Sequence, residues 1–151
     1  MITIEEFKKK QTSKTRLIGL DLGSKRIGVS ICDERQSIAT PFKTIDRINM
    51  SDLVTELKEI IKENNIKGIV IGNPINMDGT LGSSAQSVKD ISTNISQFID
   101  LPVFLWDERL STVGAFNLSS QLDVNISKKI KKIDENAAAF ILQGAIDYLN
   151  N

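Results

Sequence analysis

The chain has 151 residues, of which 40% are hydrophobic, and this length and apolar content suit one packed domain rather than two. Nineteen basic and nineteen acidic residues cancel, which excludes a protein that attracts nucleic acid through a strongly basic overall charge. Histidine is absent and Cys32 is the one cysteine, which excludes histidine-dependent nucleophiles and an internal disulfide, so any catalysis must rest on carboxylates.

Residues 1–15 are rich in charge and contain no apolar stretch that could form the core of a signal peptide. The longest apolar runs, such as residues 68–72 and 103–106, are far shorter than the roughly 20 residues that cross a bilayer. We therefore expect a cytoplasmic protein without a membrane partner. Residues 1–15 are expected to form a loosely held N-terminal arm, and residues 16–151 a single domain.

Three strands are predicted after this arm. Residues 16–21 and 26–33 are apolar and are separated by the turn Gly23-Ser24-Lys25, which suits a hairpin. Residues 38–45 suit a third antiparallel strand. Pro41 indicates that this strand lies at the edge of a sheet, because proline cannot donate a hydrogen bond to a neighbouring strand.

Helices then alternate with strands. Ser51 is a plausible N-cap for a helix that ends near residues 64–65 and carries Leu53, Leu57, Ile60 and Ile61 on one face. Residues 66–71 suit a buried parallel strand, and a loop follows over residues 72–82. The next helix has an apolar face formed by Ala85, Val88, Ile91, Ile95, Phe98 and Ile99.

The last part of the chain begins with a strand over residues 102–106 and a loop over residues 107–111. A short helix over residues 112–121 and a polar, lysine-rich stretch over residues 123–133 follow. A final helix has its apolar face formed by Ala138, Ile141, Leu142, Ala145 and Leu149. The order of elements predicts an α/β fold with a mixed five-stranded sheet flanked by helices.

Asp21 interrupts an otherwise apolar strand. An ionised carboxylate in such a run is costly to desolvate unless a cation or hydrogen-bond donors compensate its charge, and a metal ion would do so. The alternative is a strand-end residue that accepts backbone hydrogen bonds in a turn.

Glu108 follows the strand of residues 102–106, at the strand end where open α/β sheets bind their ligands. The adjacent Asp107 is expected to point elsewhere, so only one of the two suits a direct metal ligand. The alternative is that both acids are solvated and Arg109 is their salt-bridge partner.

Asp134 is predicted to open the final helix, where by itself it suits an N-cap, and the preceding lysines suit a solvated face. Together with Asp21 and Glu108, however, it could converge on divalent cations, and such oxygen ligands favour Mg²⁺ or Mn²⁺. Two ions about 3.5–4 Å apart can activate water for attack on phosphorus without any histidine.

Four segments occur in a distinctive order: residues 18–23 with 25–29, residues 72–74 with 76–80, residues 107–112, and Asp134 with residues 137–138 and 141–143. Their motifs are IGLDLG with KRIGV, GNP with NMDGT, DERLST, and D with AA and ILQ. This pattern resembles the YqgF family of pre-16S ribosomal RNA nucleases, also described as Holliday-junction-resolvase-like. The resemblance covers roughly residues 16–149.

The resemblance implies a ribonuclease-H-like fold and a phosphodiester hydrolase that uses Mg²⁺ or Mn²⁺, with two ions. It also implies a role in processing the 5′ end of pre-16S rRNA during ribosome biogenesis, and so an association with pre-rRNA and ribosomal particles, as a monomer or homodimer. The family's acidic positions, catalytic and metal-binding, fall on Asp21, Glu108 and Asp134. Phosphate contacts are expected from Lys25, Arg26, Arg109, Lys128, Lys129, Lys131 and Lys132.

The chain departs from the family pattern at Asn73, where leucine is usual, and at Ser83, where proline is frequent. Both positions bear on substrate recognition more than on metal chemistry. Three alternatives remain open: a Holliday junction resolvase acting on branched DNA, which should dimerise; a non-catalytic nucleic-acid-binding module; and an ATPase of the sugar-kinase and actin type. The last closes two domains around its nucleotide, whereas this chain has room for one.

Overall fold

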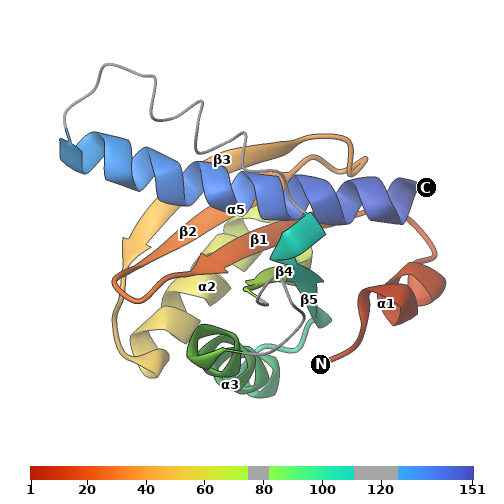
Figure 1. Ribbon diagram of the computed structural model, residues 1–151. Coiled ribbons are helices and arrows are strands. Elements are labelled where there is room, and N and C mark those ends of the chain that lie inside the picture. The colour runs from red at the N-terminus through yellow and green to blue at the C-terminus, as the bar shows by residue number, and fades with distance from the viewer. Residues whose placement is uncertain (75–81, 111–125) are drawn as a thin grey trace.

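The computed structural model describes residues 1–74, 82–110 and 126–151, and at residues 83, 110 and 126–132 it describes the backbone alone. Five strands form one sheet in the order β3-β2-β1-β4-β5 (Figure 1). β1 pairs antiparallel with β2 and β2 with β3, whereas β1, β4 and β5 run parallel. The mixed five-stranded sheet is therefore confirmed, with strands β1 (Arg16–Leu22), β2 (Arg26–Cys32), β3 (Ala39–Asp46), β4 (Ile66–Asn73) and β5 (Val103–Asp107).

β3 lies at one edge of the sheet, as the proline in its sequence predicts. Pro41 pairs with Ser30 of β2, next to a register shift between Val29 and Ser30 that marks a bulge. A missing backbone donor is tolerated at such a position because a bulged edge strand does not need a complete hydrogen-bond ladder.

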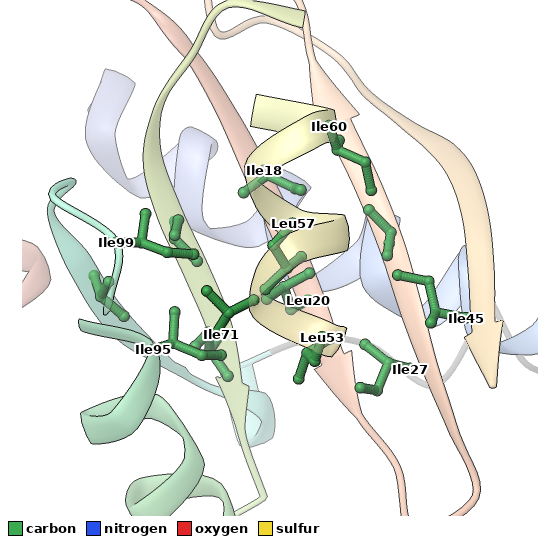
Figure 2. Packing of buried hydrophobic residues seen from close by; sticks show 14 of the residues in the cluster. Ile18, Leu20, Ile27, Ile45, Leu53, Leu57, Ile60, Ile71, Ile95 and Ile99 are labelled. Carbon is green, nitrogen blue, oxygen red and sulfur yellow. The ribbon is translucent and has the colours of Figure 1, made fainter. Parts of the chain in front are cut away.

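Helices α2 (Met50–Asn64) and α3 (Ser83–Phe98) supply the apolar core on one face of the sheet. Figure 2 shows Leu53 and Leu57 of α2 against Leu20 and Ile27 of the sheet. The expected apolar face of α3 is correct except at Phe98, which is 56% exposed. Helix α3 ends at Phe98. The next residue, Ile99, is the C-cap with an extended backbone, and its side chain is buried in the core.

The N-cap of α2 is Asn49, not Ser51 as predicted. Its backbone is extended and its side-chain oxygen accepts a hydrogen bond from the backbone N–H of Asp52 at 2.9 Å, which satisfies one of the free donors of the first turn. The other end lies where expected, because Asn65 closes the helix in the left-handed conformation, with φ of 54°.

Helix α5 (Ile126–Asn150) crosses the opposite face of the sheet (Figure 1). It begins eight residues earlier than predicted, so Asp134 lies inside the helix and is not its N-cap. The lysine-rich stretch before Asp134 contains no glycine or proline, and lysine is a good helix former, so nothing in it stops the helix. The helix expected over residues 112–121 lies outside the described residues.

The first fifteen residues are not the loose arm that was expected. Helix α1 (Ile4–Lys10) buries Ile4 and Phe7, and the Phe7 ring lies 4.8 Å from that of Phe104 between centroids. The backbone N–H of Ile2 donates to the Val103 carbonyl of the edge strand β5 at 3.0 Å. Among the described residues, no helix is both long and apolar enough to cross a membrane.

Candidate active site

The carboxyl ends of β1, β4 and β5 meet at one edge of the sheet, since the three strands are parallel neighbours. Asn73, the last residue of β4, pairs with Asp107, the last residue of β5. Asp21 lies one residue before the end of β1, and Glu108 opens the 3₁₀ helix η1 (Glu108–Leu110) directly after β5. Two of the three predicted acids therefore occupy the edge where open α/β sheets bind ligands.

Asp21 is partly buried, and this burial together with the smaller effect of the nearby Asp134 charge raises the pKa of its carboxyl from 3.8 to about 6. This shift is opposite in direction to the one that backbone hydrogen bonds to the carboxylate would cause, so it favours a cation over the turn residue of the alternative interpretation. A cation would relieve both the desolvation and the repulsion.

Glu108 packs against the backbone of β4, where its Cδ atom would lie 3.1 Å from a Cβ added to Gly72. Burial, then the charge of Asp21, then that of Asp107 raise its pKa from 4.5 to about 7. Asp107 differs, because Arg109 donates to it, with Nη2 2.7 Å from Oδ2, and this hydrogen bond lowers the pKa of Asp107. The two adjacent acids thus have different environments, as expected, and Arg109 is a salt-bridge partner of one of them.

Asp134 reaches the site from α5, on the face of the sheet that this helix covers. Its Oδ2 accepts a hydrogen bond from Nε of Arg26 at 2.7 Å. The helix can approach β2 because Gly28 has no side chain: a Cβ there would overlap the backbone carbonyl oxygen of Asp134. Ser30, two residues along β2, donates from Oγ to the carbonyl of Ala138 at 2.8 Å and ties the next turn of α5 to the strand.

These carboxylates fit a divalent cation by their chemistry. All three offer oxygen ligands, and the raised pKa values of Asp21 and Glu108 reflect burial first and neighbouring negative charges second, both of which a bound cation would offset. Within residues 1–74, 82–110 and 126–151, no three acidic or thiol side chains are already gathered closely enough to hold a metal ion. For one ion to be bound by all three acids, the carboxylates would have to move closer together; Arg26 occupies only one oxygen of Asp134 and leaves the other available.

The predicted phosphate-binding residues have different environments. Lys25 is exposed in the turn between β1 and β2. Arg26 and Arg109 each pair with a carboxylate and remain about one third exposed, at 31% and 33%. The side chains of Lys128, Lys129, Lys131 and Lys132 lie outside the described residues, as does the side chain of Ser83.

Sequence reasoning missed the residues that allow α5 to approach the sheet. Gly28 and Ser30 are two apart on β2, so both face α5, and Gly72 of β4 leaves room for Ile141 and Glu108. Small residues alternating along a strand indicate close approach by another backbone. The sequence contained this signal, but it did not indicate which element would approach the strand.

Replacement of Glu108 by Gln should make the protein more stable near pH 8 when divalent cations are removed. The folded-state pKa of Glu108 is raised, so its ionisation costs stability as pH rises from about 4.5 to about 7. After allowance for partial exposure, the gain should be roughly 1 to 3 kcal/mol at pH 8 and close to zero at pH 4. Urea unfolding with chelator at both pH values measures it, and an equal effect at both would contradict the raised pKa.

The family model described as "RuvX: Holliday junction resolvase" matches residues 15–148. A protein of Pelagibacter ubique named "Putative pre-16S rRNA nuclease" is 76% identical over 151 residues, covering 100% of both chains. A protein of the same name from Cereibacter sphaeroides is 43% identical over 98% of this chain and 92% of its own length. These matches confirm the resemblance to the YqgF family.

Solved structures confirm the ribonuclease-H-like fold. The Thermus thermophilus RuvC structure in complex with a Holliday junction substrate aligns with a TM-score of 0.55 at 10% identity, covering 89% of this chain and 94% of that one. The yeast mitochondrial Holliday junction resolvase aligns with a TM-score of 0.52 at 12% identity, covering 97% of this chain and 84% of that one. At such low identity the similarity concerns the fold alone.

Proposed function

The chain belongs to the RuvX family, and we propose that it is a metal-dependent nuclease that processes the 5′ end of pre-16S rRNA. The observation that carries this proposal is full-length 76% identity to a relative bearing the pre-16S rRNA nuclease name. The positions of Asp21 and Glu108 at one edge of the sheet, with Asp134 on α5 close enough for its charge to affect Asp21, support the hydrolytic part. The substrate would bring the protein to ribosomal particles in the cytoplasm.

Asp21, Glu108 and Asp134 are the proposed catalytic residues and would hold the metal, two ions of Mg²⁺ or Mn²⁺. When bound, such ions supply an activated water and stabilise the leaving oxygen of a phosphodiester. Asp21 is the central ligand in this proposal, because its charge affects Glu108 and the charge of Asp134 affects it in turn.

The basic residues near the acids would bind phosphates and so orient the nucleic acid. Lys25 is exposed beside the β1 end and would contact a phosphate near the acids. Arg26 and Arg109 keep about a third of their side chains exposed beyond their carboxylate partners, so their outward N–H groups would contact neighbouring phosphates. Lys128, Lys129, Lys131 and Lys132 would extend this contact along the substrate.

The test is incubation of the purified protein with 5′-extended pre-16S rRNA in the presence of Mg²⁺, of Mn²⁺ or of a chelator. Shortening of the 5′ end with either metal, and none with the chelator, is expected because all three proposed ligands are carboxylates. RNA binding without a product under any metal condition would contradict the nuclease proposal and favour a non-catalytic nucleic-acid-binding module.

A second candidate is Holliday junction resolution, because the matching family model carries that description. The same acids would act, but a resolvase cuts two strands symmetrically and should act as a dimer. Cleavage of a four-way DNA junction, measured beside the precursor RNA at equal protein concentration, separates the two. Preferential, paired cuts in the junction would favour the resolvase.

A further inference from the structure

Arg26 begins β2, and the position of its backbone is set by the turn from β1. The N–H of Gly23 donates to the Arg26 carbonyl at 3.0 Å, and a Cβ on Gly23 would lie 2.6 Å from that oxygen. The turn therefore holds the start of β2 close to the end of β1, where Asp21 lies. The backbone from which the Arg26 side chain extends is therefore fixed close to Asp21.

The partner of Arg26 is held just as firmly. The backbone of Asp134 packs on Gly28, and the Ser30 hydroxyl binds the Ala138 carbonyl one turn later, so α5 has little freedom to slide along β2. Between these two anchored backbones, Nε of Arg26 lies 2.7 Å from Oδ2 of Asp134. The side chains are 31% and 22% exposed, so the pair is partly desolvated and charge-assisted rather than a fully solvated surface contact.

Two roles are physically possible for this pair. Arg26 could compete with a metal ion for the carboxylate, or it could orient the carboxylate so that the second oxygen is available to the ion. A single bond from Nε occupies one oxygen and leaves a carboxylate able to bind a cation through the other. Hydrogen bonds of this kind from outer residues commonly orient carboxylate ligands.

We propose that Arg26 is a positioning residue that holds the Asp134 carboxylate in the orientation needed to bind the catalytic metal. This inference rests on the proposed function, because it requires Asp134 to be a metal ligand. It assigns Arg26 a task beyond the phosphate contact expected from the sequence. The two backbone anchors, at Gly23 and Gly28, provide the rigidity that such a task needs.

The test is the affinity for Mn²⁺ without RNA, measured by titration calorimetry at pH 8 on the full chain and on Arg26→Gln. Removal of a positive charge should by electrostatics alone strengthen cation binding, so weaker binding can arise only through the placement of Asp134. We expect a loss of about 10- to 100-fold for Arg26→Gln. The matched control is Arg47→Gln, which removes the same charge next to the same turn: Arg47 follows β3, and its Nη1 donates to the Gly23 carbonyl at 2.8 Å. Its affinity should not fall.

Unchanged or tighter Mn²⁺ binding by Arg26→Gln would overturn the positioning role and leave the nuclease proposal standing. Absence of Mn²⁺ binding by the unmodified protein would overturn the metal-dependent function and this inference with it. Arg26→Lys gives a second test, because an ammonium keeps the charge without the directed Nε bond. Its affinity should lie between those of the unmodified protein and Arg26→Gln, and full affinity would contradict a directional role.

Discussion

Asp21→Asn is expected to reduce metal-dependent cleavage of the precursor RNA by more than about 100-fold, beyond the usual cost of losing an outer partner of a metal ligand. The amide has nearly the same shape as the carboxylate, so the variant should fold. It lacks the negative charge that makes Asp21 the central proposed ligand. Cleavage assays with Mg²⁺ and Mn²⁺, together with Mn²⁺ titration, measure the loss.

The same variant should be more stable than the unmodified protein when metal is absent. The folded-state pKa of Asp21 is raised from 3.8 to about 6, so the free energy of unfolding falls as pH rises between these values. Ionisation of Asp21 therefore lowers the free energy of unfolding of the unmodified protein by about 3 kcal/mol at pH 8. The Asn variant should be more stable by part of this amount. Urea unfolding with chelator at pH 8 measures the difference.

Asp100→Asn is the control for both measurements, because Asp100 is exposed just before β5 begins, at the opposite end of that strand. It should leave cleavage and stability nearly unchanged. If Asp21→Asn cleaved RNA at an undiminished rate, the assignment of Asp21 would be wrong. If it were markedly less stable than the unmodified protein in chelator, the carboxylate would have a structural partner.

Gly28→Ala is expected to lower the free energy of unfolding by about 1 to 3 kcal/mol and to weaken Mn²⁺ binding more than tenfold. The added methyl group would overlap the backbone carbonyl oxygen of Asp134. Backbone cannot rotate away as a side chain can, so α5 must move off β2 at the residue that carries a proposed ligand. Urea unfolding and Mn²⁺ titration report the two effects separately.

Gly68→Ala is the matched control, because Gly68 is also a sheet glycine. An added Cβ there meets the end of a flexible side chain, Cδ2 of Leu17, at 2.8 Å, and no proposed ligand lies against it. The free energy of unfolding should fall because of this contact, but Mn²⁺ affinity should be retained. Equal loss of Mn²⁺ affinity in both variants would mean that general loosening of the sheet, and not displacement of Asp134, explains the effect.

The sequence was sufficient for the strands and for most helix faces because their signals are local. Alternating or continuous apolar residues, Pro41 and the turn at Gly23 predict the order and direction of the strands. The start of α5 was misjudged because a polar, lysine-rich stretch has the same appearance as a loop and as a solvated helix. The arm of residues 1–15 was misjudged because its buried residues, Ile4 and Phe7, form a single i, i+3 pair, which is too short to mark a helix face.

For the candidate site, the sequence by itself determined which residue types were available: no histidine, and carboxylates at the ends of apolar strands. It also determined the family, through the order of its motifs. Only the tertiary structure decided that Asp107 turns to Arg109, that Glu108 packs on Gly72, and that Asp134 is held by Arg26 over Gly28. The physical reason is that burial, repulsion between charges and close backbone approach depend on distances between segments far apart in the chain, which local pattern does not contain.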